Sequence, residues 1–457
     1  MSLTRIQVWA YGAGDLGIGL AYVAINTYFF YFLVNVAGFS PLSAGAVFVA
    51  GRVADAFTDP LIGAWSDRVR ARLPRMRLLA LAAVPTGLAF VGLFALPLVP
   101  VAPLAGAFAA SVVFSVVYTC AAMPYLAALP ELVRAYDART RVIAVKSGFT
   151  MLATLIAFAV PPALVLALSG VDDLTDTRPL DWVAMSAVLA TVATLALLLV
   201  AWVVPTPPPA RASTATPSAH VPQNLLRAVG SAWRTRGMPE AVWMFLAVTI
   251  GLMVTNSLLA FFLESVLLLP GSLLPPLLGG LVLVSIVAFP AWVRTADRIG
   301  KRRALVIALG LEIVSLLLLV SIVPADGVTW QLLAVVAVNG VAVAGVTLFP
   351  WAMLPDLAEL DELRTGARRG GLLYALFTFG QKLATSVGVF ANAIVIAAFG
   401  YVAGSVEQSP ETVRALRTLM GPVAAGVFAV AAVFAWRFPI TREVHAEARR
   451  RLAERGS

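Results

Sequence analysis

The sequence predicts an all-α membrane protein with twelve transmembrane helices arranged as two six-helix halves. Three observations support this prediction. Of the 457 residues, 60% are hydrophobic and only 12% are charged, whereas a soluble domain carries about 25% charged residues. Apolar segments long enough to cross a bilayer recur twelve times. A single polar, proline-rich segment separates the first six from the last six.

Each predicted helix contains about 20 or more predominantly apolar residues, the length that spans a bilayer. In chain order we expect helices at 8-36, 42-66, 78-98, 102-127, 142-168, 182-204, 239-268, 273-296, 302-323, 329-355, 371-399 and 412-437. Glycine and proline occur inside several of them, which lipid-embedded helices tolerate and use for close packing.

These helices divide the chain into four parts. We expect an N-terminal six-helix bundle at 1-204, a cytoplasmic linker at 205-238, a C-terminal six-helix bundle at 239-437 and a cytoplasmic basic tail at 438-457. The linker opens with PTPPPARASTATPSAHVP, which lacks the apolar periodicity of a folded element.

The basic residues predict the orientation in the membrane. If twelve helices alternate, 27 of the 33 Lys and Arg fall on one side, three fall on the other and three lie within spans. Basic loops face the cytoplasm, so we expect a multi-pass protein of the cell's inner (cytoplasmic) membrane with both termini cytoplasmic. The net charge of +9 then reflects topology, and we expect no nucleic acid partner.

The composition also argues against an enzyme. There is one cysteine, Cys120, and the two histidines, His220 and His445, lie in the linker and the tail, so Cys- or His-based metal sites are not expected. We find no nucleophile motif, phosphate loop or soluble catalytic domain. We therefore expect no enzyme and no cofactor; the partners should be a small solute and the bilayer, and the chain should act as a monomer.

The second helix carries three charged residues at membrane depth. Arg52, Asp55 and Asp59 are three and four residues apart, which places them on one face with neighbouring Cβ atoms about 5–6 Å apart. Two such carboxylates cannot both stay ionised in a low-dielectric site unless a cation or a shared proton lies between them. The pair predicts a Na⁺ or H⁺ site. The alternative is a structural Arg-Asp bridge with Asp59 beside the break at Pro60.

Lys382 lies eleven residues after Gly371 in the eleventh helix, or about 16 Å at 1.5 Å per residue, too deep to reach the interface easily. It can bridge to the Asp pair when no cation is bound, which would let it sense occupancy. The alternative is a static bridge between the two halves.

Four other ionisable residues lie within predicted spans. Asp15 follows a glycine-rich stretch that leaves room for a ligand hydroxyl or a basic partner. Lys146 comes five residues after Arg141, so it either snorkels to the cytoplasmic surface or contacts substrate. Glu312 and Glu264 have no evident partner in the sequence.

The two halves share a motif. Asp67-Arg68-Val-Arg70 follows the second helix, and Asp297-Arg298-Ile-Gly-Lys301-Arg302-Arg303 follows the eighth, 230 residues later. Parallel repeats with a substrate site between them are typical of the major facilitator superfamily. Two unrelated basic loops are the alternative.

The sequence resembles the glycoside–pentoside–hexuronide:cation symporter family. The similarity lies in Tyr11-Gly12-x-Gly14-Asp15, in Arg52-x-x-Asp55-Ala-x-x-Asp59-Pro60-x-x-Gly63, and in Arg364-Thr365-Gly366-x-Arg368-Arg369-x-Gly371-Leu372-Leu373-Tyr374 running to Lys382. It covers essentially the whole chain, with looser matches at Tyr118-Thr119 and Pro124-Tyr125.

The resemblance implies a cation site at Asp55 and Asp59, with Thr119 supplying a further oxygen and Lys382 nearby. Thr58, which we also expect among the cation-binding residues, stands where such symporters often have Asn, and this weakens the expectation of Na⁺ over H⁺. The sequence is compatible with either Na⁺ or H⁺ as the coupling ion.

The resemblance also implies a sugar site at Asp15 and Lys146, the latter where Arg is usual, with Tyr125 close by. A sugar-binding acid and a stacking Trp of the family are replaced by Ala122 and Leu126. We therefore expect cation-coupled symport of a small solute, a sugar or glycoside, by alternating access. The alternative is a proton-coupled major facilitator transporter of a non-sugar amphiphilic or drug-like solute.

Overall fold

Helices make up all the regular secondary structure that the structure describes. The computed structural model describes residues 3–69, 72–99, 103–133, 136–205, 230–324, 327–366 and 369–439, together with 444, 447 and 450–451. Most of the expected linker 205-238 and most of the expected tail 438-457 therefore lie outside the described residues.

The N-terminal half contains six spans that match the first six predicted segments. They are α1 (Arg5–Ala24) with its π-helical continuations η1 (Ile25–Phe29) and η2 (Phe32–Val36), α2 (Pro41–Val69), α3 (Arg75–Phe94), α4 (Pro103–Leu132), α5 (Tyr136–Ser169) and α6 (Pro179–Val203). Short 3-10 turns, η3 (Leu96–Leu98) and η4 (Leu174–Asp176), lie in its loops.

The C-terminal half repeats this arrangement. Its spans are α8 (Met238–Ser265), α9 (Leu274–Ile299) preceded by η5 (Gly271–Leu273), α10 (Lys301–Ser321), α11 (Trp330–Thr365), α12 (Gly370–Ala398), and a last span formed by α13 (Pro410–Thr418), η6 (Leu419–Val423) and α14 (Ala424–Arg437). The helix α11 ends at Thr365, ten residues beyond the predicted segment 329-355. The prediction stops short because many of these last residues are charged, and apolar length is the criterion.

Eleven helices in the described part of the chain are long and apolar enough to cross a membrane. The one predicted span that is not among these eleven helices is 42-66, which forms α2, a helix of 29 residues. Its charged stripe of Arg52, Asp55 and Asp59 lowers its hydropathy below that of its neighbours. The twelve-helix prediction is thus confirmed, and the unusual helix is the one that carries the candidate site.

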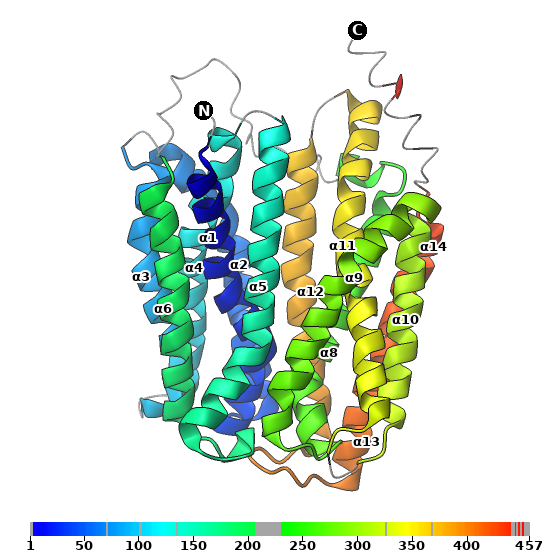
Figure 1. Cartoon of the computed structure of the whole chain (residues 1–457). Helices are drawn as coiled ribbons and strands as arrows, with labels where there is room; N and C mark the ends of the chain where they lie inside the picture. Colours follow the sequence, from blue (N-terminus) through cyan, green and yellow to red (C-terminus); the bar gives the residue numbers. More distant parts are fainter. Residues whose placement is uncertain are drawn as a thin grey trace.

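The packing of the helices shows that the halves are pseudo-repeats. In the first half α1 packs against α5 and α6, α3 packs against α4 and α6, and α2 packs against α4. The equivalent helices of the second half make the same pairs: α8 with α12 and α14, α10 with α11 and α14, and α9 with α11. The halves meet through α2 with α12 and α5 with α9, again an equivalent pair. Figure 1 shows the two bundles side by side.

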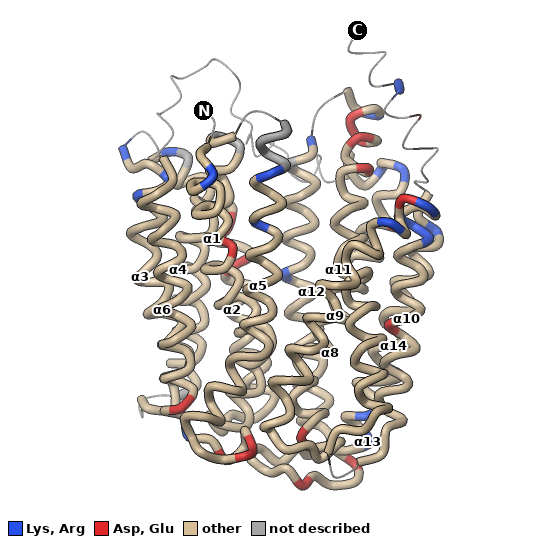
Figure 2. The backbone as a smooth tube through the Cα atoms, in the orientation of Figure 1, with Lys and Arg blue, Asp and Glu red and all other residues tan. Residues whose placement is uncertain are grey.

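The first helix, α1, begins and the last helix, α14, ends at the same end of the helical bundle (Figure 1), as an even number of spans requires. Figure 2 shows that Lys and Arg gather at this end. The motifs at the ends of α2 and α9 lie there as well, so the repeated basic sequence marks equivalent positions in the two halves.

The opposite end is closed by hydrogen bonds that join the two halves. Tyr31 of η1–η2 donates to Glu264 at the end of α8. Asn35 Oδ1 accepts from Tyr401 Oη at 3.1 Å and from Gly404 N at 3.2 Å. These contacts are buried or partly buried, so they join the two halves away from solvent at this end.

Candidate functional site

The charged stripe of α2 faces the inside of the protein. Arg52 and Asp55 are 4% and 2% exposed, and Arg52 Nη1 lies 3.2 Å from Asp55 Oδ2. The guanidinium also lies over the ring of Tyr22, 5.0 Å from its centroid. Arg52 is therefore fixed by an ion pair on one side and an aromatic face on the other.

A ladder of hydroxyls on α4 holds α2 at close range. Ser111 and Ser115 donate to the backbone carbonyls of Val47 and Gly51, at 3.1 and 2.8 Å. The next hydroxyl, four residues on, is Thr119, and it points at the two carboxylates instead of the backbone. The period of four residues on both helices explains why Thr119 reaches the acids.

Thr119 joins the two acids. Its Oγ1 lies 3.0 Å from Asp59 Oδ1 and 3.5 Å from Asp55 Oδ1. Thr58, by contrast, donates to the backbone carbonyl of Asp55 at 3.4 Å. The oxygen donors that converge are those of Asp55, Asp59 and Thr119, and hard cations prefer such oxygen ligands.

Lys382 of α12 completes the cluster from the other half. Its Nζ forms an ion pair with Asp59 Oδ2 and lies 3.9 Å from Asp55 Oδ2. Each carboxylate thus has its own base, Arg52 for Asp55 and Lys382 for Asp59. A cation that enters between the acids competes with Lys382 for the same oxygens.

This cluster suits a monovalent cation or a proton better than a structural metal. Among the described residues, no group of three or more His, Cys, Asp or Glu side chains is placed to hold a metal ion. Two carboxylates with two basic neighbours leave little net charge for a divalent ion to neutralise.

Asp15 and Lys146 form a second polar site. Lys146 Nζ lies 2.9 Å from Asp15 Oδ1 and 3.0 Å from Tyr125 Oη. Thr150 donates to the other carboxylate oxygen of Asp15 at 3.3 Å. Of the two expectations for Lys146, the structure favours the inward one, because its ammonium points to Asp15 and not to the membrane surface.

Gly14, next to Asp15, allows Tyr125 to pack closely against α1 beside the Asp15–Lys146 pair. A Cβ at Gly14 would lie 2.3 Å from Tyr125 Cε2, so only glycine lets the Tyr125 ring pack on α1. Tyr11 and Tyr125 then stack at 4.8 Å between centroids, and each hydroxyl donates to the other's backbone carbonyl. The ammonium of Lys146 lies 4.2 Å from the centroid of the Tyr125 ring.

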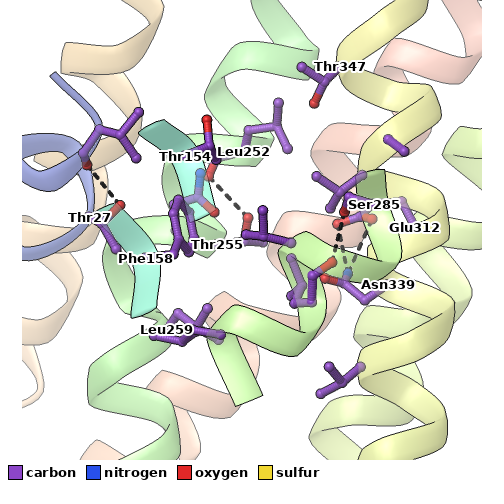
Figure 3. A pocket seen from close by; sticks show the side chains of 18 of the residues that line it. Thr27, Thr154, Phe158, Leu252, Thr255, Leu259, Ser285, Glu312, Asn339 and Thr347 are labelled. Carbon is purple, nitrogen blue, oxygen red and sulfur yellow. Dashed lines mark hydrogen bonds between the residues drawn. The ribbon is translucent and has the colours of Figure 1, made fainter. Parts of the chain in front are cut away.

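A cavity of about 480 Å³ lies between the halves. Thr150, Thr154 and Phe158 of α5 line one wall, and Glu312 and Asn339 line the other. Figure 3 shows these two walls facing each other, with Leu252, Thr255 and Leu259 of α8 between them. Most of the lining side chains are Leu, Val, Ile, Met or Phe.

The other residues singled out in the sequence have distinct places. Glu264 belongs to the closed end, against Tyr31, while Glu312 faces the cavity. Ala122 is buried at 3% exposure and Leu126 is 50% exposed; neither is among the residues that line this cavity.

Sequence reasoning identified Thr119 and Tyr125 but missed other uncharged polar residues, namely Ser111, Ser115, Thr150 and Asn339. Ser111 and Ser115 have a signal in their spacing to Thr119, which is four residues each time. Thr150 likewise comes four residues after Lys146 and shares its face. Asn339, which meets Glu312, has no comparable signal, because the contact joins two helices.

Known proteins of similar sequence are transporters. The family model described as "MFS/sugar transport protein" matches residues 10–442. An uncharacterized symporter of Synechocystis is 25% identical, covering 98% of this chain and 96% of the relative. The isoprimeverose transporter of Lactiplantibacillus pentosus is 23% identical over 89% of this chain and 83% of its own.

A relative with a different cargo is the sphingosine-1-phosphate transporter of Mus musculus, 26% identical over 90% of this chain and 85% of its own. Among solved structures, the D-xylose-proton symporter superposes with a TM-score of 0.66 at 18% identity, over 95% of this chain and 97% of that chain. That likeness establishes the shared fold. With a family match that extends from residue 10 to residue 442, the chain belongs to the MFS/sugar transport protein family of membrane transporters.

Proposed function

We propose that this protein is a secondary active transporter that couples the symport of a small solute to Na⁺ or H⁺. The observation that carries the proposal is the cluster of Asp55, Asp59, Thr119 and Lys382 at the contact of α2 with α12. A site made by both halves changes whenever the halves move, which is the requirement for coupling to alternating access.

Coupling follows from competition at Asp59. With the cation absent, the Lys382 ammonium neutralises Asp59 and ties the two halves together. When a cation binds between Asp55, Asp59 and Thr119, it displaces the ammonium and weakens that tie. The halves can then rock around the cavity with the solute bound, so movement of the solute-loaded protein depends on the cation.

We propose that the protein lies in the inner membrane with both termini cytoplasmic. The end that carries the termini also carries the concentration of Lys and Arg (Figure 2), and the positive-inside rule assigns such an end to the cytoplasm. The end closed by Tyr31 and Glu264 then faces outward. We propose a monomer whose partners are the bilayer and its solute.

The solute that we propose is a glycoside with an apolar part. Thr150 lines the cavity and donates to Asp15, which is paired with Lys146. This group supplies hydrogen-bonding partners for hydroxyls at one wall, and the apolar lining of the cavity accommodates an aglycone. The replacement of a sugar-binding acid and a stacking Trp by Ala122 and Leu126 argues against a bare disaccharide.

A second candidate is proton-coupled transport of a non-sugar amphiphile or drug-like solute. It is favoured by the same apolar lining and by the similarity to a sphingosine-1-phosphate transporter. In that case the Asp55–Asp59 pair would take a proton in place of Na⁺, because two adjacent carboxylates readily share one.

Uptake into proteoliposomes separates these functions. The purified chain would be tested with radiolabelled glycosides and with long-chain amines, each under a Na⁺ gradient, a pH gradient or neither. Concentrative uptake of a glycoside that requires one gradient supports the first proposal. Uptake of amines alone under a pH gradient, in excess of their passive accumulation in protein-free liposomes, supports the second. Solute levels that match those of protein-free liposomes under every gradient overturn both.

A further inference from the structure

Glu312 is a buried carboxylate that the coupling cluster does not use. It lies in the middle of α10, is 1% exposed and lines the cavity. Its two oxygens, Oε1 and Oε2, each accept a hydrogen bond from Asn339 Nδ2 at 3.2 Å. Asn339 Nδ2 also donates to Ser315 Oγ at 3.0 Å. Figure 3 shows Glu312 and Asn339 together on one wall.

Both oxygens of this carboxylate have a hydrogen-bond partner, but further acceptor positions remain open. A carboxylate has about four acceptor positions, whereas the two contacts to Glu312 come from one amide nitrogen. In the described part of the chain no Lys or Arg forms an ion pair with it, unlike Asp55, Asp59 and Asp15. A polar group left in this state inside a membrane protein is costly unless a ligand completes it.

The basic groups of the neighbouring helices are engaged elsewhere. At the start of α10, Lys301 is bound to Asp356 at 2.7 Å, and Arg302 donates to the backbone of Phe438. Arg417 of α13 donates to the carbonyls of Val320 and Ile322 at the C-terminal end of α10. No basic side chain among these turns toward Glu312.

We propose that Glu312, with Asn339 and Ser315, forms a second recognition site that binds hydrogen-bond donors, hydroxyl or ammonium, at the far end of the solute. This inference rests on the proposed transport function and defines its substrate class more closely. The solute carries polar groups at both ends, one at Thr150, which contacts Asp15, and the other at Glu312.

The apolar residues between the two walls fit the middle of such a solute. Leu252 and Leu259 of α8 and Phe158 of α5 line the same cavity as Thr154 and Glu312 (Figure 3). A purely polar sugar would leave them without contacts, and a simple lipid tail would leave Glu312 unsatisfied. A solute with a donor group at each end and an apolar body satisfies both.

The test uses the full-length protein in lipid nanodiscs and two named probes. 4-Nitrophenyl β-D-glucoside presents hydroxyls on an aromatic body, and phenethylamine presents an ammonium on a similar body. Dicyclohexylcarbodiimide reports on Glu312 directly, because it converts a protonated carboxyl in an apolar site to a stable N-acylurea that peptide mass spectrometry locates.

We expect the carbodiimide to modify Glu312 and one probe to protect it. Protection by the glucoside identifies a hydroxyl-bearing solute, and protection by phenethylamine identifies an amine. Glu312→Gln should weaken binding of the protecting probe about tenfold, because the amide keeps the shape of the carboxyl group but has one oxygen acceptor fewer. Glu407→Gln, an exposed loop variant with the same chemical change, should bind as wild type.

Two results overturn the inference. One is a Glu312 that resists the carbodiimide in the folded wild type, which would make it a sealed structural group between α10 and α11. The other is modification that neither probe prevents. The labelling needs no variant to fold, and it does not depend on uptake, so a failed gradient experiment and a failed Glu312 site remain distinguishable.

Discussion

Lys382 on α12 forms an ion pair with Asp59 on α2, a residue 323 positions earlier in the chain. The side chains are 11% and 18% exposed, so each charge is largely shielded from water and is compensated by the other. Breaking a buried pair by removing one partner typically costs about 3–5 kcal/mol, because it leaves a charge uncompensated. The pair therefore contributes to stability and also sets what a cation must displace.

The first prediction concerns this pair. Asp59→Asn should abolish gradient-driven accumulation while leaving exchange of solute across proteoliposomes partly intact. The variant keeps the shape of the side chain but cannot hold a cation or proton against Asp55. It also strands the Lys382 ammonium, so its thermal unfolding midpoint should fall.

The double variant Asp59→Asn, Lys382→Gln provides the control for stability. Removing both charges should restore much of the lost midpoint without restoring accumulation. Normal concentrative uptake in Asp59→Asn would show that coupling lies elsewhere. An unfolding midpoint that falls further in the double variant would show that the two residues are not energetically paired.

The second prediction tests the role of Lys146. Lys146→Gln removes the partner of Asp15, and we expect the KM for the transported solute to rise about tenfold or more, the usual effect of losing a charged hydrogen bond. Lys146→Arg keeps the charge and should retain most of the uptake. Equal KM values for Lys146→Gln and wild type would assign Lys146 a purely structural role.

The third prediction concerns the close approach of α2 and α4. A Cβ added at Gly51 would lie 2.3 Å from Ser111 Oγ, so Gly51→Ala should destabilise the fold by about 1–3 kcal/mol. It should also weaken cation dependence, since the same hydroxyl ladder positions Thr119. The matched variant Gly63→Ala lies on the same helix with nothing within 4 Å of the new Cβ and should not lower the unfolding midpoint. Equal midpoints for both variants would contradict the tight packing.

Much of this fold follows from the sequence, since a twelve-fold recurrence of long apolar segments leaves few architectures. The stripe on α2 was also predictable, because Arg52, Asp55 and Asp59 lie on one helix and obey helical spacing. The partner of Glu312 was not. Asn339 meets it only through the packing of α10 on α11, and no local pattern encodes that contact. The direction of Lys146 was ambiguous for a similar reason, since its distance from Arg141 fits both the surface and the interior.

The last prediction concerns the closed end. Tyr31 and Tyr28 are both fully buried, but Tyr31 donates across the halves to Glu264, whereas Tyr28 donates to the Phe158 carbonyl within its own half, at 2.5 Å. Removing the Tyr31 hydroxyl leaves the Glu264 carboxylate without that partner in the closed state only. Tyr31→Phe should therefore favour opening at this end, and Tyr28→Phe should not.

Accessibility from outside measures this shift. A single probe cysteine, Asn256→Cys in the cavity lining, would be placed in a Cys120→Ala background and labelled with a membrane-impermeant maleimide on right-side-out vesicles. A loss of about 1.4 kcal/mol from the closed state corresponds to about tenfold faster labelling for Tyr31→Phe, because an unsatisfied buried partner costs about 1–3 kcal/mol. Both variants lose one hydroxyl from the same helical stretch, but only Tyr31→Phe loses a contact between the halves. Equal labelling rates in the Tyr31→Phe and Tyr28→Phe proteins would therefore show that the bond to Glu264 does not hold this end shut.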